Sequence, residues 1–517
     1  MRRILFIRDE KAPFESVQLL QDMFYDALSD RFDLTVKSAG SVSKSEYNGL
    51  LKSHQAIVGT DMNLFKARKS FNLRVPVVLP SYGLGTRGLL QIWEWRELLQ
   101  KGDAFICPST ADLASILVHI RDKQLNFCHL PYPVPDFYFQ NKDSDISKAE
   151  IFSRFGIDHQ SQSSWLMYSG RINQQKNIHL SLRVVKALVE MNHSVGLLIV
   201  GQEDRSGFPE LGWDNTGYEE ELKNLIEDLQ IQDRVHFLGL VDRQTMHDLY
   251  HCVDLHLTLS TFRTEDFGFT SVEAMACGLP TVGTAWGGFW DTIKEGITGY
   301  RVPVHMTSMG FRVDWRAAVS RIIKILTNPD LRSYLEMSCK IYSRSQFTSR
   351  LFKDRFEEAI IRIIENQDNL DGSLDIQSMV DEPTLDFFQD LDTGHKGSGS
   401  LLDARKNLYA NKKSKRVNDF FTEYSRSQPI VLSRDFQIYS PLPLRIEGNQ
   451  TTILDRNWPG RITLQKSELE ILNVISHNVK TLTDLAKSLN LTLDEVIGLI
   501  QPMFEKGLLI PLQDTQI

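Results

Sequence analysis

The sequence predicts an α/β protein with two doubly wound domains, followed by a small α+β domain. Up to residue 366, short apolar runs alternate with longer amphipathic stretches such as "NIHLSLRVVKALVEM" and "YEEELKNLIEDL". The runs are flanked by Gly or Pro and rich in Val, Ile and Leu, which is typical of strands buried on both faces of a parallel sheet. Beyond residue 432, short alternating strands and three helical patterns replace this order.

The predicted strands fall into two groups. The first is "ILFIR", "QAIVG", "VPVVLP" and "DAFICP"; the second is "WLMYSG", "GLLIVG", "VHFLG", "DLHLTLS" and "LPTVGT". Strand–helix alternation places helices on both faces of each sheet. Because the alternation pauses in a polar stretch, the two domains are predicted over residues 1–160 and 161–366. An acidic stretch at 367–432 is predicted to be a mobile linker, and residues 433–517 form the last domain.

Composition and charge are those of a soluble globular protein. The 517 residues exceed one compact core, because a domain averages about 150 residues. The net charge of -8 and the pI of about 5.9 argue against nucleic-acid binding through bulk charge. Five cysteines show no C-x-x-C pair and no His partner at metal spacing, which indicates reduced thiols rather than disulfides or zinc. Without a signal peptide or a transmembrane-length apolar run, we expect a cytoplasmic protein.

Two charged stretches lie between the domains. Asp390 and Asp392 form a D-x-D pattern that could hold a metal–nucleotide complex, but a solvated acidic linker is the better interpretation. The basic run at 405–416 could contact a membrane or nucleic acid, and a solvated helix face is the more common arrangement.

The stretch "TEDFGFTSVEAMACGLPTV", residues 264–282, carries two glutamates eight positions apart. Glu265 lies in a loop at the carboxyl end of a predicted strand, where open α/β sheets bind ligands. Glu273 is expected in the first turn of the following helix. Backbone N–H groups of Gly268, Phe269 and Thr270 could face the oxygens of a ligand. For Glu273 there is a structural alternative, because Thr270-x-x-Glu273 is a capping box.

A second stretch, "WLMYSGRINQQKNIHLSL", runs from a strand through Gly170 into a loop with Arg171 and Lys176, and then into a helix. Glycine allows the backbone to turn tightly, and two cations beside a helix N-terminus form a pocket for a diphosphate. Basic loop residues usually just face solvent. This loop, however, follows the first strand of the domain that carries the glutamate pair, which favours a binding site.

The segment from about 165 to 305 resembles the retaining GT-B glycosyltransferases of the family 4 group. The resemblance rests on "YSGRINQQKN", "LLIVGQ", "VHFLGLVDRQTMHDLYHCVDLHLTLS", "EDFGFTSVEAMACGLPTV" with its E-x7-E pair, and "EGITGYRV". It covers the second domain well and the first only loosely. It implies two Rossmann-like domains facing a cleft, and transfer of a sugar from a nucleoside-diphosphate sugar to an acceptor.

The resemblance also implies residue roles. Arg171 and Lys176 would hold the donor diphosphate and stabilise the charge that develops as the sugar leaves. Glu273 would accept hydrogen bonds from the ribose hydroxyls, and Glu265 would bind hydroxyls of the donor sugar. The remaining donor-binding positions would be Gly170, Gly268, Phe269 and Thr270. Neither glutamate need be a nucleophile, since retention in this family is thought to proceed by same-face attack. No metal and no cofactor besides the nucleotide sugar is implied.

The first domain departs from the family pattern. "RDEKAPFES" stands where a Gly-Gly loop is usual, and "VVLPSYGLGTRG" stands where a histidine is frequent. Tyr82, Gly83 and Arg87 in the latter segment could contact the acceptor or a donor phosphate. Further candidates in this domain are His54, His119 and His129, and none of them is assigned as catalytic. A non-catalytic scaffold, epimerisation and phosphorolysis therefore remain alternatives to glycosyl transfer.

The last domain shows a hairpin followed by three helical patterns, which predicts a winged helix. Its candidate recognition helix, "TLDEVIGLIQPMFEKG", carries three acidic residues against one lysine, which disfavours DNA phosphates. The segment resembles the peptide-binding winged-helix domain of the pyrroloquinoline-quinone peptide-chaperone type, which takes a peptide as an added strand. Packing on the enzyme or dimerisation is the alternative. The acceptor could be a peptide, protein, lipid or saccharide, and the donor base and sugar stay open.

Overall fold

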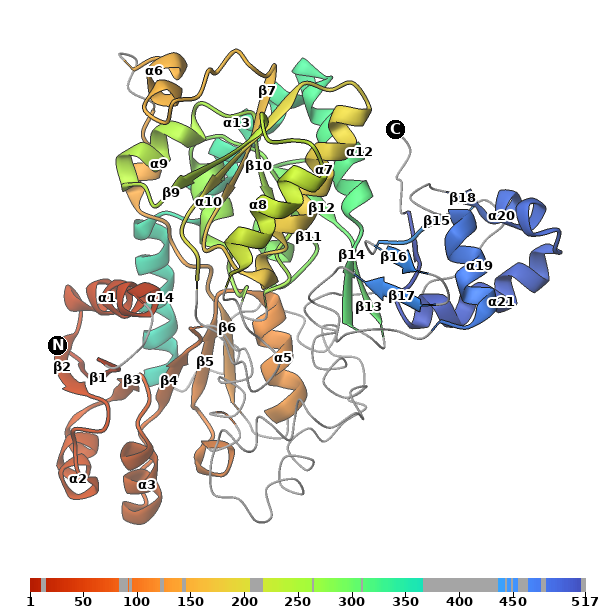
Figure 1. Cartoon of the computed structure of the whole chain (residues 1–517). Coiled ribbons are helices and arrows are strands. Elements are labelled where there is room, and N and C mark those ends of the chain that lie inside the picture. Colours follow the sequence, from red (N-terminus) through yellow and green to blue (C-terminus); the bar gives the residue numbers. More distant parts are fainter. Residues whose placement is uncertain are drawn as a thin grey trace. The chain divides into compact units, whose positions relative to one another are not determined.

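The computed structural model describes most of the chain outside the predicted linker (Figure 1). The described residues are 1–10, 15–82, 92, 95–120, 125–141, 146–204, 217–262, 265–307, 310–365, 436–441, 444–447, 450–453, 464–475 and 480–512. The linker at 367–432, with its D-x-D and basic run, lies outside them, as do Gly83 and Arg87. Within the described ranges, no helix combines the length and the apolar character that crossing a bilayer requires.

These residues form two compact units. One contains residues 1–136, 265–268 and 343–365, and the other contains 137–262, 269–342 and 436–512, with the gaps given above. Each of the two units is built around a six-stranded parallel sheet. The expectation of two Rossmann-like parallel-sheet domains is thereby confirmed.

The first sheet has the strand order β2-β1-β3-β4-β5-β6. Its strands are β1 (Arg3–Arg8), β2 (Asp33–Ser38), β3 (Ala56–Val58), β4 (Val77–Pro80), β5 (Ala104–Cys107) and β6 (Asn126–His129). The helices between them are α1 (Glu15–Ser29), α2 (Lys44–Ser53), α3 (Met62–Phe71) and α5 (Thr110–Ile120). All neighbouring strands pair in parallel, as the strand–helix alternation predicts.

A buried ion pair ties α3 to this sheet. Arg68 donates to both carboxylate oxygens of Asp103, at 2.6 and 2.7 Å, and both side chains are 0% exposed. Asp103 also accepts hydrogen bonds from the backbone N–H groups of Val77 and Gln100. These extra bonds offset part of the cost of burying two charges.

Distant chain segments complete the first unit. Helix α14 (Ser349–Ile364) packs on α1, where the ring of Phe24 lies 5.2 Å from that of Phe352 and 4.8 Å from that of Phe356. Phe267, in segment 265–268, has its ring 5.7 Å from that of Tyr132. The sequence placed α14 at the end of the second domain; its aromatic face instead joins it to the first unit.

The second sheet has the order β12-β11-β10-β7-β8-β9. Its strands are β7 (Ser164–Ser169), β8 (Val195–Val200), β9 (Val235–Gly239), β10 (Leu255–Thr258), β11 (Thr281–Thr284) and β12 (Gly299–Val302). Its main helices are α7 (Ile178–Glu190), α8 (Tyr218–Asp228), α9 (Arg243–Tyr250), α10 (Phe269–Ala276), α12 (Trp315–Leu326) and the first part of α13 (Pro329–Gln346). Counted from β7, this is the 3-2-1-4-5-6 order of a dinucleotide-binding fold.

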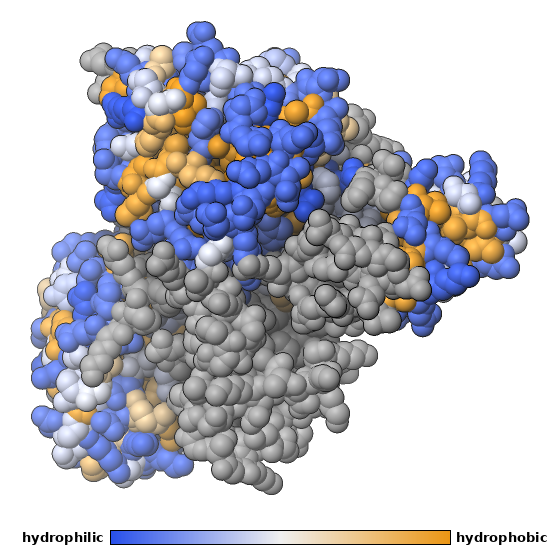
Figure 2. Space-filling model, in the orientation of Figure 1, coloured by the Kyte–Doolittle hydropathy of each residue, from blue (hydrophilic) through white to orange (hydrophobic). Residues whose placement is uncertain are grey.

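Helix α8 separates apolar from acidic residues on its two sides. Tyr218, Leu222 and Ile226 face inward, whereas three consecutive glutamates begin the helix. Figure 2 shows a mainly hydrophilic surface over this part of the second unit. Acidic residues in the first turn suit the positive end of a helix dipole.

The C-terminal residues form three helices, α19 (Lys466–Ile475), α20 (Leu482–Leu489) and α21 (Leu493–Glu505). They pack with an antiparallel sheet of order β18-β15-β19, made of β18 (Lys480–Thr481), β15 (Gln437–Tyr439) and β19 (Ile510–Pro511). A hairpin of β16 (Leu444–Glu447) and β17 (Gln450–Ile453) confirms the predicted strand pair. Their core is Ile438, Ile471, Leu472, Ile475, Leu482, Leu485, Val496, Ile500, Met503, Phe504, Leu508 and Leu509.

This C-terminal module contacts the hairpin of β13 (Val304–Thr307) and β14 (Gly310–Val313) and the start of α12. The buried hydroxyl of Tyr439 donates to Asp314 at 2.7 Å, and its ring packs against Trp315. The Nε–H group of Arg312 donates to the carbonyl of Gly507 at 3.0 Å. Asp314 also caps the N-terminus of α12. One carboxylate therefore hydrogen-bonds both to α12 and to the C-terminal module.

Candidate functional site

The strand order of the second sheet reverses between β7 and β10, which lie side by side. In an open α/β sheet, ligands bind at the carboxyl ends of the strands at such a switch point. The loop after β7 (residues 170–177) and the loop after β10 (residues 259–262) start there. The first loop contains the predicted residues Arg171 and Lys176. The second contains Phe262, whose ring both of them contact.

Gly170 begins the first loop in a conformation that few other residues adopt. Its φ is +139°, and Gly201, after β8, has a φ of +140°. A Cβ built on Gly201 would lie 1.9 Å from the carbonyl oxygen of Gly170. This close approach of the two backbones requires glycine at position 201, and the positive φ favours glycine at position 170.

Arg171 is anchored at the start of the loop. Its Nη1 donates to Asp204 at 2.8 Å, and the guanidinium lies 5.2 Å from the ring centre of Phe262. Asn173 donates to the same carboxylate oxygen at 3.2 Å. The Arg171 side chain is still 42% exposed, so it combines a fixed position with access for an incoming anion. A guanidinium carries N–H donors in a planar fork, a geometry that suits the oxygens of a phosphate.

Lys176 lies on the same aromatic ring. Its Nζ is 5.0 Å from the ring centre of Phe262, so both cations contact the same ring. Lys176 ends the short helix η3 (Gln174–Lys176), which Asn173 caps, and α7 begins two residues later. Two positive side chains beside a helix N-terminus form a site suited to a phosphate or diphosphate.

The loop after β10 is held on several sides. The side-chain amide of Asn177 donates to the carbonyl of Leu259 and to the hydroxyl of Thr261, both at 2.9 Å. The indole N–H of Trp286 donates to the carbonyl of Phe262 at 2.9 Å. These bonds fix the ring on which Arg171 and Lys176 lie, so the cations are positioned before any ligand arrives.

Glu273 lies at the end of a polar network in the same unit. The hydroxyl of Tyr250 is 3.4 Å from Glu273 Oε2 and 3.3 Å from the carbonyl of Thr270. On its other side this hydroxyl lies 2.9 Å from Ser169 Oγ, which is 3.1 Å from Nε2 of His256. The network links the carboxylate on α10 to the end of β7, one residue before Gly170.

Burial changes the charge state of both ends of this network. It raises the pKa of the Glu273 carboxyl to about 7, against the opposite effects of the Tyr250 hydrogen bond and the Arg243 charge. It also lowers the pKa of His256 to about 3, so this imidazole is neutral near neutral pH. Hydrogen bonds from a ligand's hydroxyls would favour the carboxylate form of Glu273 and bring its pKa down.

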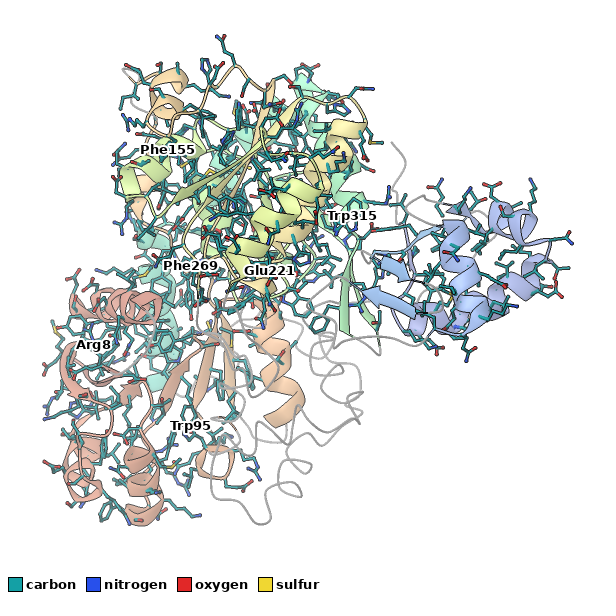
Figure 3. All side chains as sticks on the ribbon, viewed as in Figure 1. Arg8, Trp95, Phe155, Glu221, Phe269 and Trp315 are labelled. Carbon is teal, nitrogen blue, oxygen red and sulfur yellow. The ribbon has the colours of Figure 1, made fainter. Side chains whose placement is uncertain are left out.

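The helix that carries Glu273 begins earlier than the sequence indicated. Helix α10 starts at Phe269, which Figure 3 marks, and not at Thr270 or Ser271. Glu273 therefore lies beyond the first turn, and the capping box with Thr270 does not form. The carboxylate contacts Tyr250 instead, which removes the structural explanation that the sequence offered for this glutamate.

The predicted donor residues belong to both units. Arg171, Lys176 and Glu273 belong to the second, with Gly170, Phe269 and Thr270. Glu265 and Gly268 belong to the first unit, where Glu265 is buried at 8% exposure and Gly268 has a φ of +82°. The positive φ explains glycine at this position.

Two of the histidine candidates of the first domain, His54 and His129, have structural partners. Nδ1 of His54 lies 2.7 Å from the carbonyl of Leu50, and its Nε2 lies 2.9 Å from Oγ1 of Thr35. Nε2 of His129 lies 3.2 Å from the carbonyl of Pro108. Tyr82 packs edge-on against Phe24, and burial raises the pKa of its hydroxyl. The side chain of His119 lies outside the described residues.

Sequence reasoning missed Asp204, Tyr250 and Phe262. Asp204 follows the strand next to β7, so the rule on strand carboxyl ends could have found it. The two aromatic residues carry no local signal, because each partner lies far away in the chain. It also missed the grouping of His247, His251 and Cys277, although the two histidines are spaced one helical turn apart.

Comparison with known proteins agrees with this geometry. Residues 150–340 match the family model described as "Glycosyl transferases group 1". A D-inositol 3-phosphate glycosyltransferase of Mycobacteroides abscessus is 30% identical over 229 residues, 44% of this chain and 46% of that protein. A mannosylfructose-phosphate synthase of Agrobacterium fabrum is 31% identical over 183 residues, 35% of this chain and 37% of that protein. The chain thus spans less than half the length of these curated relatives.

Solved structures extend the likeness to both sheets. The Anabaena protein HepE in complex with UDP is similar with a TM-score of 0.53 at 16% identity, over 70% of this chain and 100% of that one. Sucrose-phosphate synthase from Thermosynechococcus elongatus gives a TM-score of 0.53 at 14% identity, over 71% and 100% of the two chains. At these identities the likeness establishes the fold, which is the two-domain GT-B type.

Proposed function

We propose that the chain is a glycosyltransferase that moves a sugar from a nucleoside-diphosphate sugar to an acceptor. The observation that carries the proposal is the pair of cations, Arg171 and Lys176, held on the ring of Phe262 at the switch point of the second sheet. The match of residues 150–340 to the group 1 glycosyltransferase model supports it. UDP in the complex of a similar fold is consistent with a nucleoside-diphosphate donor.

In this proposal, Arg171 and Lys176 bind the diphosphate and stabilise the negative charge that develops on it as the sugar–phosphate bond breaks. No metal ion is then needed at the diphosphate. Glu273 accepts hydrogen bonds from the ribose hydroxyls, and the Tyr250 network holds its carboxylate in place. Glu265 binds hydroxyls of the donor sugar, while the N–H groups of α10 contribute at its N-terminus.

We further propose that transfer retains the anomeric configuration, by attack of the acceptor on the face from which the diphosphate departs. Nuclear magnetic resonance of the product is the test. An α-configured donor should give an α-linked product, and a β-linked product would refute retention. The E-x7-E pair of Glu265 and Glu273 is the feature that motivates this assignment to the family 4 type.

The C-terminal module is proposed to be a winged helix that presents a peptide or protein acceptor. Its hairpin of β16 and β17 offers strand edges for an added strand. Asp494 and Glu495 begin α21, which suits neither DNA nor RNA phosphates. A chain ending at residue 366 should keep donor hydrolysis and lose transfer to the acceptor. Equal transfer by this shortened chain would exclude a role for the module.

The test of donor binding is a screen of UDP-, GDP-, ADP- and dTDP-sugars by thermal shift and by release of the nucleoside diphosphate. A donor at about 100 times its dissociation constant adds roughly 2.7 kcal/mol to stability, a shift of several degrees. Lys176→Ala should lose about 1.5–3 kcal/mol of donor binding, roughly ten- to hundredfold in affinity.

Matched substitutions separate the site from general destabilisation. Lys186→Ala removes a lysine of α7 that pairs with Glu190, and Glu227→Ala removes an exposed glutamate of α8. Both variants should bind donor as the parent does, whereas Glu273→Ala should not. A well-folded protein that binds none of the donors would contradict the transferase proposal and favour a non-catalytic scaffold.

A further inference from the structure

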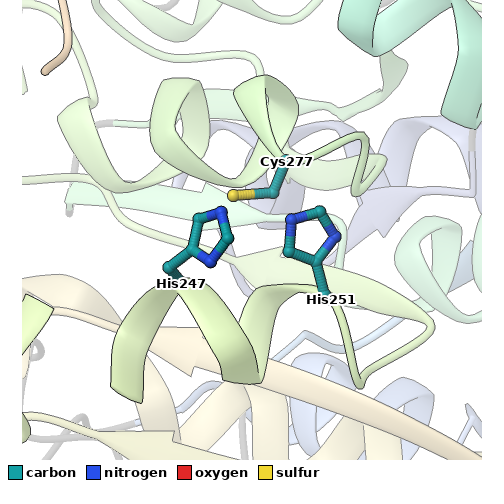
Figure 4. A group of neighbouring side chains, drawn as sticks. All are labelled: His247, His251 and Cys277. Carbon is teal, nitrogen blue, oxygen red and sulfur yellow. The ribbon is translucent and has the colours of Figure 1, made fainter. Parts of the chain in front are cut away.

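Two histidines and a cysteine meet between α9 and the end of α10. Figure 4 shows a ring nitrogen of His247 and one of His251 turned toward Sγ of Cys277. One potential ligand atom from each residue lies within 4.8 Å of the other two. His247 and His251 are one helical turn apart, and Cys277 follows the last residue of α10. We propose that this cluster binds a zinc ion, which joins α9 to the helix that carries Glu273.

The ligand types suit zinc. Imidazole nitrogen and thiolate sulfur are the ligands that zinc prefers, and three protein ligands leave a fourth tetrahedral position for water. Zinc–nitrogen bonds of about 2.0 Å and zinc–sulfur bonds of about 2.3 Å place neighbouring ligand atoms roughly 3.3–3.6 Å apart in a tetrahedron. Because the three ligand atoms lie within 4.8 Å of one another, zinc binding requires them to close by at most about 1.2–1.5 Å.

The surroundings of His247 match those of a metal ligand. Its Nε2 lies 3.2 Å from the carbonyl of Gln140, and its Nδ1 lies 3.7 Å from Oδ1 of Asp248. Metal binding at Nε2 would replace its hydrogen bond to the Gln140 carbonyl and put the ring proton on Nδ1, which faces the Asp248 carboxylate. A carboxylate behind a metal-bound histidine is a frequent arrangement, because it fixes the ring and raises the basicity of the ligand nitrogen.

Buried polar atoms without hydrogen-bond partners beside the cluster support the zinc site. Among the described residues, Nδ1 of His247 and Oδ2 of Asp248 are buried and have no hydrogen-bond partner. His247 is 2% exposed and Asp248 is 1% exposed, so water does not satisfy these atoms at the surface. Leaving such atoms unpaired is costly, and in the metal-bound tautomer the proton on Nδ1 would face the Asp248 carboxylate.

The cysteine would enter the site as a thiolate. In the metal-free protein the Cys277 thiol donates toward the carbonyl of Tyr138 at 3.5 Å. Zinc binding would break the S–H bond, form the Zn–S bond and release the proton to solvent. His251 is only partly buried, which provides a route for the ion from the surface. Lys340, whose charge favours the thiolate, and Glu273, whose charge opposes it, are the charged groups that act on this sulfur.

The first experiment measures metal content and cobalt binding in the full-length chain. Metal-free protein, prepared with a chelator, is titrated with Co²⁺ and then with Zn²⁺ in competition. We expect one ion per chain, a thiolate-to-cobalt charge-transfer band, the strong visible absorption of tetrahedral cobalt, and loss of both signals as zinc displaces it. Cobalt binding without a thiolate band, or no binding, would overturn the proposal.

Four variants assign the ligands. Cys277→Ser should abolish the charge-transfer band, and His251→Gln should weaken binding at least tenfold. Asp248→Asn should weaken it ten- to hundredfold, the loss typical for a partner of a metal-bound histidine. Cys339→Ser is the control, because Cys339 is also buried in the second unit but lies outside the cluster. A band that survives Cys277→Ser in folded protein, or one lost equally in Cys339→Ser, would refute the site.

Discussion

The neutral imidazole of His256 makes the second unit sensitive to acid. His256 lies on β10, is fully buried, and contacts Ser169 at the end of β7. Burial lowers its pKa from 6.5 to about 3, whereas the unfolded chain titrates near 6.5. Below pH 6.5 the unfolded state therefore binds more protons, so stability is present above this pH and is lost progressively as the pH falls toward 3.

The size of the effect follows from the two pKa values. Between pH 7 and pH 5, protonation of His256 in the open state should cost about 2 kcal/mol, a roughly 25-fold increase in the population of opened β10. The value of about 2 kcal/mol applies to any local unfolding that exposes the His256 imidazole to water. Other titrating groups contribute to the pH dependence of stability in addition to His256.

Deuterium exchange read by mass spectrometry measures this opening. The exchange of β10 is compared with that of β1 in the same sample, so the intrinsic pH dependence of amide exchange cancels. In the parent, β10 should lose about 25-fold in protection relative to β1 between pH 7 and pH 5. In His256→Gln the ratio should stay constant. Equal pH dependence in both proteins would refute the assignment of the acid sensitivity to His256.

Three further substitutions test other features. Phe262→Leu removes the ring shared by two cations and should weaken donor binding by about 1 kcal/mol, roughly fivefold, measured by titration calorimetry. Asp103→Asn leaves Arg68 buried without a counter-charge and should destabilise the first unit by about 3–5 kcal/mol in urea unfolding. Tyr439→Phe should loosen the C-terminal module by about 1–3 kcal/mol, seen as faster exchange in α12.

Two control variants and one contradicting result accompany these substitutions. Phe237→Leu changes a ring under Lys223, away from the switch point, and should leave donor affinity unchanged. Asp354→Asn breaks the exposed pair with Arg350 and should change stability by less than about 0.5 kcal/mol. If Asp103→Asn and Asp354→Asn changed stability equally, burial would not explain the importance of the Arg68–Asp103 pair. If Tyr439→Phe left deuterium exchange in α12 unchanged, the Tyr439–Asp314 hydrogen bond would not stabilise the contact between α12 and the C-terminal module.

The sequence predicts the strands that are buried on both faces, because their apolar runs are unbroken. Strand β2 was missed: it lies at the edge of its sheet, and none of its residues is fully buried, so its sequence, "DLTVKS", has no apolar run. Strand β6 was missed because only Phe127 and Cys128 of its four residues are buried. A strand without a run of apolar residues therefore gives little hydrophobic signal, whereas the edge strand β9 was predicted from its run "VHFLG".

The site residues that could be predicted are those with a local signal in the sequence. Arg171 and Lys176 were predicted because a glycine, two cations and a helix start stand together in one loop. Phe262 and Tyr250 were not, because an aromatic residue has no charge pattern to mark it. Their partners are also distant in the chain: Phe262 contacts Arg171, and Tyr250 contacts Ser169 and Glu273, 81 and 23 positions away. Glu273 was expected in the first turn of its helix and lies just beyond it, since Phe269 rather than Thr270 begins α10.

The discontinuity of the first unit has a practical consequence for dissecting the protein. Phe24 on α1 packs against Phe352 and Phe356, which are more than three hundred residues away, and Tyr132 packs against Phe267. A fragment cut at residue 160 would expose these faces to water and would be prone to aggregate. Fusing residues 343–365 to its end through a flexible linker would restore the α14 contact. Such a fusion, rather than a simple truncation, is the way to isolate this half for acceptor-binding experiments.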